Sequence, residues 1–340
     1  MTGSRVPDPL RCLALALAFG CAGPGFDLAS APDAPIAIVH RTREESDRRT
    51  DLLDRVQGRT PASTLERMRV ADLGAWLGLG PDPAARQLAL LGRLALLDPR
   101  TGVVERVDAA LGGARPHCWS ADRERLLFSG LVRGQEPQLM EYRPATGEVR
   151  RVTHGPRLHP GGCYGPGERQ VWVEARPGSA GHEARLVLAP EAGGEPRVLT
   201  DGPADVAPVW SPRGDLIAFQ TRDREGGTGI AVVDPAGGPV RLVARGKEPG
   251  FAPSGDWIVY SAQQRGRWRL WRMRPDGSGK LPLGEGTLDE HDPSVSSDGR
   301  FVVFVGQEKD SVRERLFVRG FDGRGDVPLV DRDEGSHPTW

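Results

Sequence analysis

The stretch Pro208-Val-Trp-Ser-Pro-Arg-Gly-Asp-Leu-Ile-Ala-Phe219 decides the fold, because it reads as an apolar strand, a tight turn and a second apolar strand. In the turn Ser211-Pro-Arg-Gly214, proline presets φ for the second position, and glycine supplies the left-handed residue that reverses the chain. Two apolar strands joined by such a turn predict a β-hairpin.

Variants of this hairpin recur along the chain. Their leading prolines are 41 to 48 residues apart, at Pro116, Pro160, Pro208, Pro249, Pro293 and Pro338. A period of roughly 40–45 residues is typical of the four-stranded blades of β-propellers. A second series with the same period consists of a short apolar run and a glycine turn, as in Ile230–Val233 followed by Asp234–Gly238. This series predicts the third and fourth strands of each blade.

Two copies of the first hairpin depart from the pattern. Arg123 and Glu168 stand where the other copies have the turn glycine. Since a side chain disfavours the left-handed conformation, we expect these two hairpins to be looser or differently bulged.

The residues of the repeat resemble those of TolB-type propellers. The resemblance rests on the Trp-Ser-Pro-x-Gly turn at 210–214, the following Ile217-Ala-Phe219 and the Val-Asp-x-x-Gly-Gly turn at 233–238. It covers residues 93–340, with a further strand at 36–42, and it implies an all-β, six-bladed propeller. TolB carries an α/β domain before its propeller, and we expect none in this chain, because the sequence before the first blade is too short.

The last copy of the repeat, His337-Pro-Thr-Trp340, supplies only an inner strand, so a second strand must come from elsewhere. Ile36-Ala-Ile-Val-His40 matches the pattern of Ile217-Ala-Phe-Gln-Thr221. A blade cannot bury its two faces alone, and an open ring would leave strand edges unpaired. We therefore expect the C-terminal strand to pair beside Ile36–His40 and to close six four-stranded antiparallel blades.

The N-terminal residues predict export. Residues 1–20 look like a signal peptide of lipoprotein type, with an apolar run that is too short to span a bilayer. Ala18-Phe-Gly-Cys21 resembles a lipobox, which makes Cys21 the predicted site of lipidation, and cleavage without a lipid is the alternative. The predicted location is the periplasm or the outer membrane, where a lipid anchor would hold the protein.

The remaining chain divides into a tether and the propeller. Residues 21–35 are small and proline-rich, which predicts a short tether, and residues 36–340 form the propeller. An insert at about 44–92 interrupts the first blade. Within it, the apolar residues of 60–79 recur near helical spacing and predict a short helix that packs on the propeller flank. A role of this insert in binding a partner stays open.

Composition and motifs exclude several classes of function. The net charge of −1 offers no general attraction for nucleic acid. The chain lacks the Gly-x-Ser-x-Gly elbow of hydrolases, the Walker loop of nucleotide-binding proteins and the His-Glu-x-x-His helix of zinc peptidases. We therefore predict no catalytic residues and no cofactor.

Two cysteines occupy equivalent places in neighbouring blades. Cys118 precedes Trp119, and Cys163 precedes Tyr164. An exported protein meets an oxidising compartment, so a disulfide between the two blades is a candidate, provided that the Cα atoms lie within about 7 Å. Two buried thiols are the alternative.

Polar residues cluster beside the leading prolines of the repeat. They are His117, His159, Glu248, His291, Asp292 and His337. Inner strands enter beside the central channel, so these side chains predict a polar channel mouth that contacts a partner. Imidazoles and carboxylates are also metal ligands, and His159, His291 and His337 are candidates if they converge.

These features favour non-catalytic binding of another envelope protein or peptide at the channel mouth. The resemblance to TolB-type propellers implies a peptidoglycan-associated lipoprotein as a candidate partner. The alternative function is that of a carbohydrate-active, lyase-like propeller enzyme that uses the channel histidines and a metal.

Overall fold

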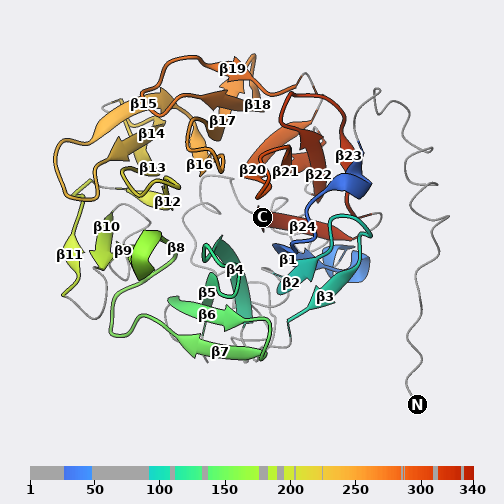
Figure 1. The fold of residues 1–340 in the computed structure, drawn as a ribbon, viewed down its shortest axis with the longest axis horizontal. Coiled ribbons are helices and arrows are strands. Elements are labelled where there is room, and N and C mark those ends of the chain that lie inside the picture. Colours follow the sequence, from blue (N-terminus) through green and yellow to red (C-terminus); the bar gives the residue numbers. More distant parts are fainter. Residues whose placement is uncertain are drawn as a thin grey trace, which may run out of the picture.

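The computed structural model describes residues 27–47, 92–107, 112–131, 137–175, 183–189, 195–202, 204–223, 225–284, 286, 288–308, 313–330 and 333–340. Within these residues the strands form six four-stranded antiparallel sheets, arranged as blades around a central axis (Figure 1). The predicted all-β, six-bladed propeller is confirmed. Figure 1 also shows the C-terminus near the centre of the ring.

Each blade runs from an inner strand at the channel to an outer strand at the rim. Blade 1 contains β24 (Glu334–Thr339), β1 (Ile36–Arg41), β2 (Arg93–Leu97) and β3 (Val104–Arg106). Blade 2 contains β4 (Gly112–Trp119), β5 (Leu126–Leu131), β6 (Gln138–Arg143) and β7 (Glu148–Arg151). Blade 3 contains β8 (Gly162–Tyr164), β9 (Gln170–Ala175), β10 (Ala184–Ala189) and β11 (Arg197–Val198).

The other three blades follow the same order. Blade 4 contains β12 (Val206–Trp210), β13 (Ile217–Arg222), β14 (Thr228–Val233) and β15 (Arg241–Arg245). Blade 5 contains β16 (Lys247–Phe251), β17 (Ile258–Gln264), β18 (Arg267–Met273) and β19 (Leu281–Pro282). Blade 6 contains β20 (Asp289–Val295), β21 (Phe301–Gln307), β22 (Glu314–Gly320) and β23 (Val327–Pro328). Two short 3₁₀ turns, η1 (Leu28–Ser30) and η2 (Pro166–Glu168), are also present, and residues 43–47 are helical.

The two hairpins without the turn glycine behave differently. Arg123 adopts the left-handed φ of 64°, and its N–H donates to the Ser120 carbonyl at 2.9 Å, so this turn is not loosened. The hairpin is differently bulged, because the pairing of β4 with β5 has a further register shift between Pro116 and Cys118. The guanidinium of Arg123 lies over the Trp119 ring at 4.6 Å, which helps to hold the unfavourable backbone. In blade 3 the turn is remodelled into η2, and Gly167 supplies the positive φ of 68° one residue before Glu168.

The C-terminal strand closes the ring as predicted. β24 pairs antiparallel with β1, with Ala37 opposite Thr339 and Arg41 opposite Glu334. Trp340 is buried and stacks on Phe301 of blade 6, with ring centroids 6.1 Å apart. On the other side, Trp119 Nε1 of blade 2 donates to the Thr339 carbonyl at 3.1 Å. The last two residues therefore join blade 1 to both of its neighbours.

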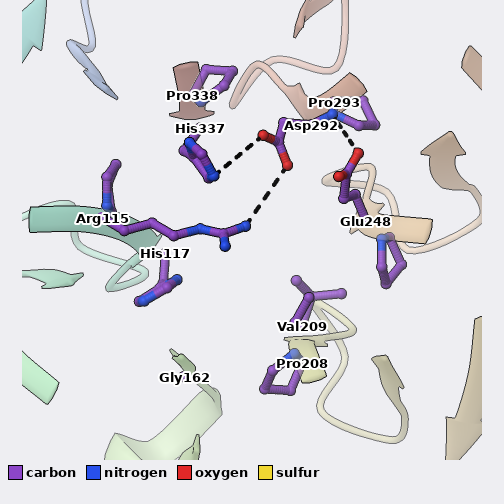
Figure 2. A pocket seen from close by; sticks show the side chains of 13 residues that line it. Arg115, His117, Gly162, Pro208, Val209, Glu248, Asp292, Pro293, His337 and Pro338 are labelled. Atoms are coloured by element: carbon purple, nitrogen blue, oxygen red, sulfur yellow. Dashed lines mark hydrogen bonds and ion pairs between the residues drawn. The ribbon is translucent and has the colours of Figure 1, made fainter. Parts of the chain in front are cut away.

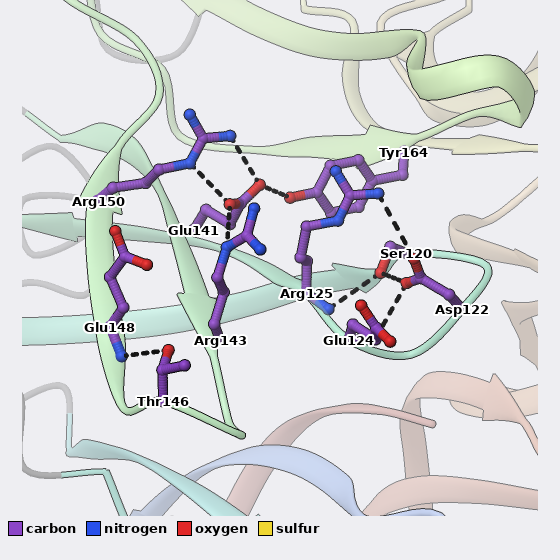
Figure 3. A network of polar contacts seen from close by, with 10 residues as sticks. All are labelled: Ser120, Asp122, Glu124, Arg125, Glu141, Arg143, Thr146, Glu148, Arg150 and Tyr164. Carbon is purple, nitrogen blue, oxygen red and sulfur yellow. Dashed lines mark hydrogen bonds and ion pairs between the residues drawn. The ribbon is translucent and has the colours of Figure 1, made fainter.

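A buried polar contact joins blades 2 and 3 (Figure 3). The carboxylate of Glu141 on β6 accepts hydrogen bonds from Arg150 Nε at 2.7 Å and from the Tyr164 hydroxyl of β8 at 2.5 Å. Burial acts to raise the pKa of Glu141, but these hydrogen bonds outweigh burial, and the pKa is lowered. Burial raises the pKa of Tyr164, so this hydroxyl keeps its proton.

Next to this contact the structure joins Cys118 of β4 and Cys163 of β8 by a disulfide. Their Cα atoms lie 5.1 Å apart, within the range that a disulfide spans without backbone movement. The concern that equivalent positions of neighbouring inner strands lie too far apart does not apply to this pair.

Parts of the sequence predictions lie outside the described residues. The signal peptide at 1–20, Cys21 and most of the insert, including the expected helix at 60–79, fall there. Of the predicted tether, residues 27–35 are described, and Ala31 is buried in the core between blades 1 and 6. Among the described residues, no helix has both the length and the apolar character needed to cross a membrane.

Replacing the Trp340 side chain by a methyl group should weaken the ring at its closing strand. We expect Trp340→Ala to reduce the free energy of unfolding by about 3–5 kcal/mol, because a large buried aromatic ring is lost. Urea unfolding followed by circular dichroism measures this. Val198→Ala, at a half-exposed site on the rim strand β11, is the matched control and should change stability by less than about 0.5 kcal/mol. Equal effects of both substitutions would argue against closure by the C-terminal strand.

The disulfide is tested by counting thiols under denaturing, non-reducing conditions. The unprocessed chain has four cysteines. If Cys118 and Cys163 are bridged, the wild type and the Cys118→Ser/Cys163→Ser variant show the same number of free thiols. Two more thiols in the wild type would exclude the bridge. Loss of the bridge should lower stability by about 2–4 kcal/mol.

Candidate functional site

One position of the repeat carries the candidate site, namely the residue before the leading proline. The six blades place there Arg115, His159, Ala207, Glu248, Asp292 and His337. Four of these residues have a positive φ, between 48° and 58°, at Ala207, Glu248, Asp292 and His337. The pairing of inner and second strands shifts register at the same four places. The repeat thus builds a β-bulge before each of these prolines, and a bulge redirects a side chain out of the sheet.

The bulges deliver their side chains to a cavity of about 90 Å³ on the channel axis, which we call the central cavity (Figure 2). All six blades contribute to its lining through their inner strands or the residues beside them. Prolines form much of the wall, and Val209 adds an apolar surface. The polar side chains are those of Arg115, His117, Glu248, Asp292 and His337.

The two carboxylates of the central cavity have different surroundings. Glu248 Oε2 accepts the backbone N–H of Asp292 at 2.7 Å and the Ser261 hydroxyl at 3.2 Å, and Lys247 Nζ lies 3.0 Å from Glu248 Oε1. Asp292 has looser partners, with His337 Nε2 at 3.7 Å and Arg115 Nη2 at 3.9 Å. Burial raises the pKa of Asp292, while the nearby Arg115 opposes that shift.

Both histidines of the central cavity are held neutral. Burial lowers the pKa of His117 and of His337 well below the usual value, and the positive charge of Arg115 adds to the effect. His117 Nε2 lies 3.0 Å from the Ser129 hydroxyl, a hydrogen bond that a neutral imidazole can make. Near neutral pH these two rings are therefore polar but uncharged.

The structure brings together four of the six residues expected at the channel mouth, namely His117, Glu248, Asp292 and His337. The other two histidines do not line the central cavity. His159 is buried, with Nδ1 3.2 Å from Gln138 Oε1, and His291 packs against Trp268 with ring centroids 5.8 Å apart.

Sequence reasoning missed Arg115. Its side chain points from β4 across the central cavity toward Asp292 (Figure 2). The signal was present, because Arg115 directly precedes Pro116 as Glu248 precedes Pro249. The predicted site was based on histidines and carboxylates near the prolines. The position directly before each proline would also have included Arg115 and Ala207.

The metal candidates His159, His291 and His337 do not share one cavity. Across the part of the chain that the structure describes, no three histidine, cysteine, aspartate or glutamate side chains are grouped to hold a metal ion.

The lowered histidine pKa values predict a loss of stability in mild acid. A histidine in the unfolded chain has a pKa near 6.5. Below that pH the unfolded chain binds protons at His117 and His337 that the folded chain does not bind, because the fold lowers the pKa of both rings. The free energy of unfolding should therefore fall as the pH drops below about 6.5. Asp292 acts in the opposite sense, because its raised pKa lets the folded state hold a proton more readily.

A variant isolates the histidine contribution, because it leaves Asp292 in place. Urea unfolding between pH 7.5 and 5.5 should show a steeper loss for the wild type than for His117→Gln/His337→Gln. The excess should reach at most about 1.4 kcal/mol per pH unit for each histidine. Parallel pH profiles would show that these rings are not held neutral by the fold.

Comparison with known proteins agrees with this architecture. Residues 179–340 match the TolB beta propeller domain. An uncharacterized protein of Agrobacterium fabrum is 29% identical over 161 residues, which make up 46% of this chain and 53% of that protein. The match thus spans about half the length of that relative.

Solved structures share the fold at low sequence identity. TolB from Acinetobacter baumannii has a TM-score of 0.63 at 17% identity, over 91% of this chain and 67% of that one. A candidate TolB from Agrobacterium tumefaciens has a TM-score of 0.60 at 22% identity, over 70% of this chain and 88% of that one. With its closed ring of six blades and its match to the TolB beta propeller domain over residues 179–340, the chain is similar to the TolB-like β-propellers.

Proposed function

We propose that this chain is an exported, lipid-anchored propeller that binds another envelope protein or peptide at its central cavity without catalysing a reaction. The observation that carries the proposal is the convergence of bulged, pre-proline side chains from several blades on one small polar cavity. Export and acylation at Cys21 belong to the proposal on the strength of the N-terminal sequence.

The backbone at the cavity supports a functional role for these residues. A positive φ in a residue other than glycine costs of order 1–3 kcal/mol, and such residues persist only where the surrounding structure holds them. Four of them stand at one repeat position, around one cavity. They include Glu248, Asp292 and His337, whose side chains are able to recognise a polar group. Such residues gather at binding sites more often than elsewhere in folds.

The size of the cavity favours a protruding group over an enclosed substrate. Its volume of about 90 Å³ is far below the roughly 300–1,000 Å³ of pockets that surround a whole small molecule. A single side chain or a chain terminus of a partner would fit, while the rest of the partner would lie on the surrounding blades. By resemblance to TolB-type propellers, a peptidoglycan-associated lipoprotein is the candidate partner.

The alternative function, a lyase-like enzyme, requires three histidines at one site. That hypothesis needs His159, His291 and His337 to meet around one metal, whereas His337 alone of the three lines the central cavity. The binding proposal uses His337 and needs neither of the other two.

Site-specific photo-crosslinking in envelope extracts tests the proposal. A benzoylphenylalanine in place of Val209, inside the central cavity, should capture a partner protein in a single band. The same residue in place of Val198, exposed on the rim strand β11, is the matched control and should capture little. Equal capture from both sites, or capture from Val198 alone, would contradict binding at the channel.

A further inference from the structure

We propose that the central cavity binds a carboxylate presented by the partner, and that Arg115 is the residue that holds it. This inference rests on the proposed function and adds the chemistry of the group that enters. It starts from the position of the guanidinium, which lies in the cavity and has no acceptor at hydrogen-bond distance among the described residues.

No described residue accepts a hydrogen bond from the Arg115 guanidinium. A guanidinium carries five N–H donors in a planar fork. Within the described residues its recorded polar contact is with Asp292 Oδ1, 3.9 Å away, which is too long for a hydrogen bond. The Arg115 side chain is 48% exposed, so solvent reaches these donors and they are accessible to an acceptor that comes from outside the chain.

The charges around the cavity leave Arg115 as the cation that a ligand meets. Among the residues that line the cavity, Arg115 is the one lysine or arginine. His117 and His337 are neutral near pH 7, because burial lowers the pKa of each. Lys247 lies outside the lining and pairs with Glu248 at 3.0 Å.

The two carboxylates do not satisfy the guanidinium. Glu248 already accepts from the Asp292 backbone, from Ser261 and from Lys247. Asp292 is near enough to attract Arg115 but too far to bond it. An incoming carboxylate could take both donors of one edge of the fork, while Asp292 would still steady the opposite side.

The shape of the site suits a carboxylate better than a bulkier anion. A planar carboxylate matches the fork with two parallel hydrogen bonds. The prolines and Val209 add an apolar wall to the same cavity. An acidic side chain and a free C-terminus both carry this group, so the test separates these two sources.

Direct binding of small probes tests the inference without the natural partner. Saturation-transfer NMR on the full chain would use N-acetylglycine for a C-terminus, N-acetylglutamate α-amide for an acidic side chain, and N-acetylglycinamide as the neutral match. We expect at least one carboxylate probe to bind at millimolar concentrations and the neutral amide not to bind. The stronger of the two carboxylates identifies the source.

Variants assign the contact to Arg115. Arg115→Met should weaken the carboxylate probe about 10–100-fold, because a charge-assisted hydrogen-bonded pair is lost. Arg115→Lys should lie between, since it keeps the charge and loses the fork. Arg213→Met is the matched control, because Arg213 lies on an exposed hairpin outside the cavity and should leave binding unchanged.

Several outcomes would overturn the inference. These are binding of neither carboxylate, equal binding of the neutral amide, equal binding to Arg115→Met, and tighter binding of inorganic phosphate than of both carboxylates. The proposed function fails separately. If crosslinking from position 209 captures the partner with undiminished yield in the Arg115→Met variant, then binding at the channel stands and the carboxylate contact is wrong.

Discussion

The antiparallel ladder between β1 and β24 is the contact on which the rest of the molecule depends. Each blade buries its faces only against its neighbours, so a core exists only when the first and last segments meet. Thr339 and Trp340 extend that ladder into contacts with blades 2 and 6. Because His337 lies on the same strand, closing the ring also completes the central cavity.

Within the repeat, the residues that build the blade differ from the residues that line the cavity. The proline and the following hairpin recur from blade to blade, and four of the six blades place a bulge before the proline. In five of the six blades the preceding residue lines the central cavity, and its identity differs between blades, as Ala207, Glu248 and His337 illustrate. A ring of similar blades can therefore carry an asymmetric set of charges without any change in its architecture.

The repeat in the sequence was enough to predict the blades, their order and the closing strand, because each is set by local turns and strand periodicity. The site was predicted only in part. Side chains alternate along a strand, so His291, one residue before the bulge position, faces away from the channel toward Trp268. His117, two residues after Arg115, returns to the channel side. His159 is absent from the cavity lining for another reason. The inner strand β8 is only three residues long and begins after His159, and Gly162 of this strand lines the cavity.

The presence of an arginine at the centre changes what the cavity can recognise. Imidazoles and carboxylates around a channel would suit a cation, and that pattern prompted the metal alternative. A guanidinium among them supplies the positive charge itself, and its field, with burial, keeps His117 and His337 neutral. An anion would meet the donors of Arg115, and repulsion from Glu248 is reduced because Lys247 and the Asp292 N–H already contact that carboxylate. Imidazoles and carboxylates alone would favour a cation, whereas the same groups together with Arg115 favour an anion.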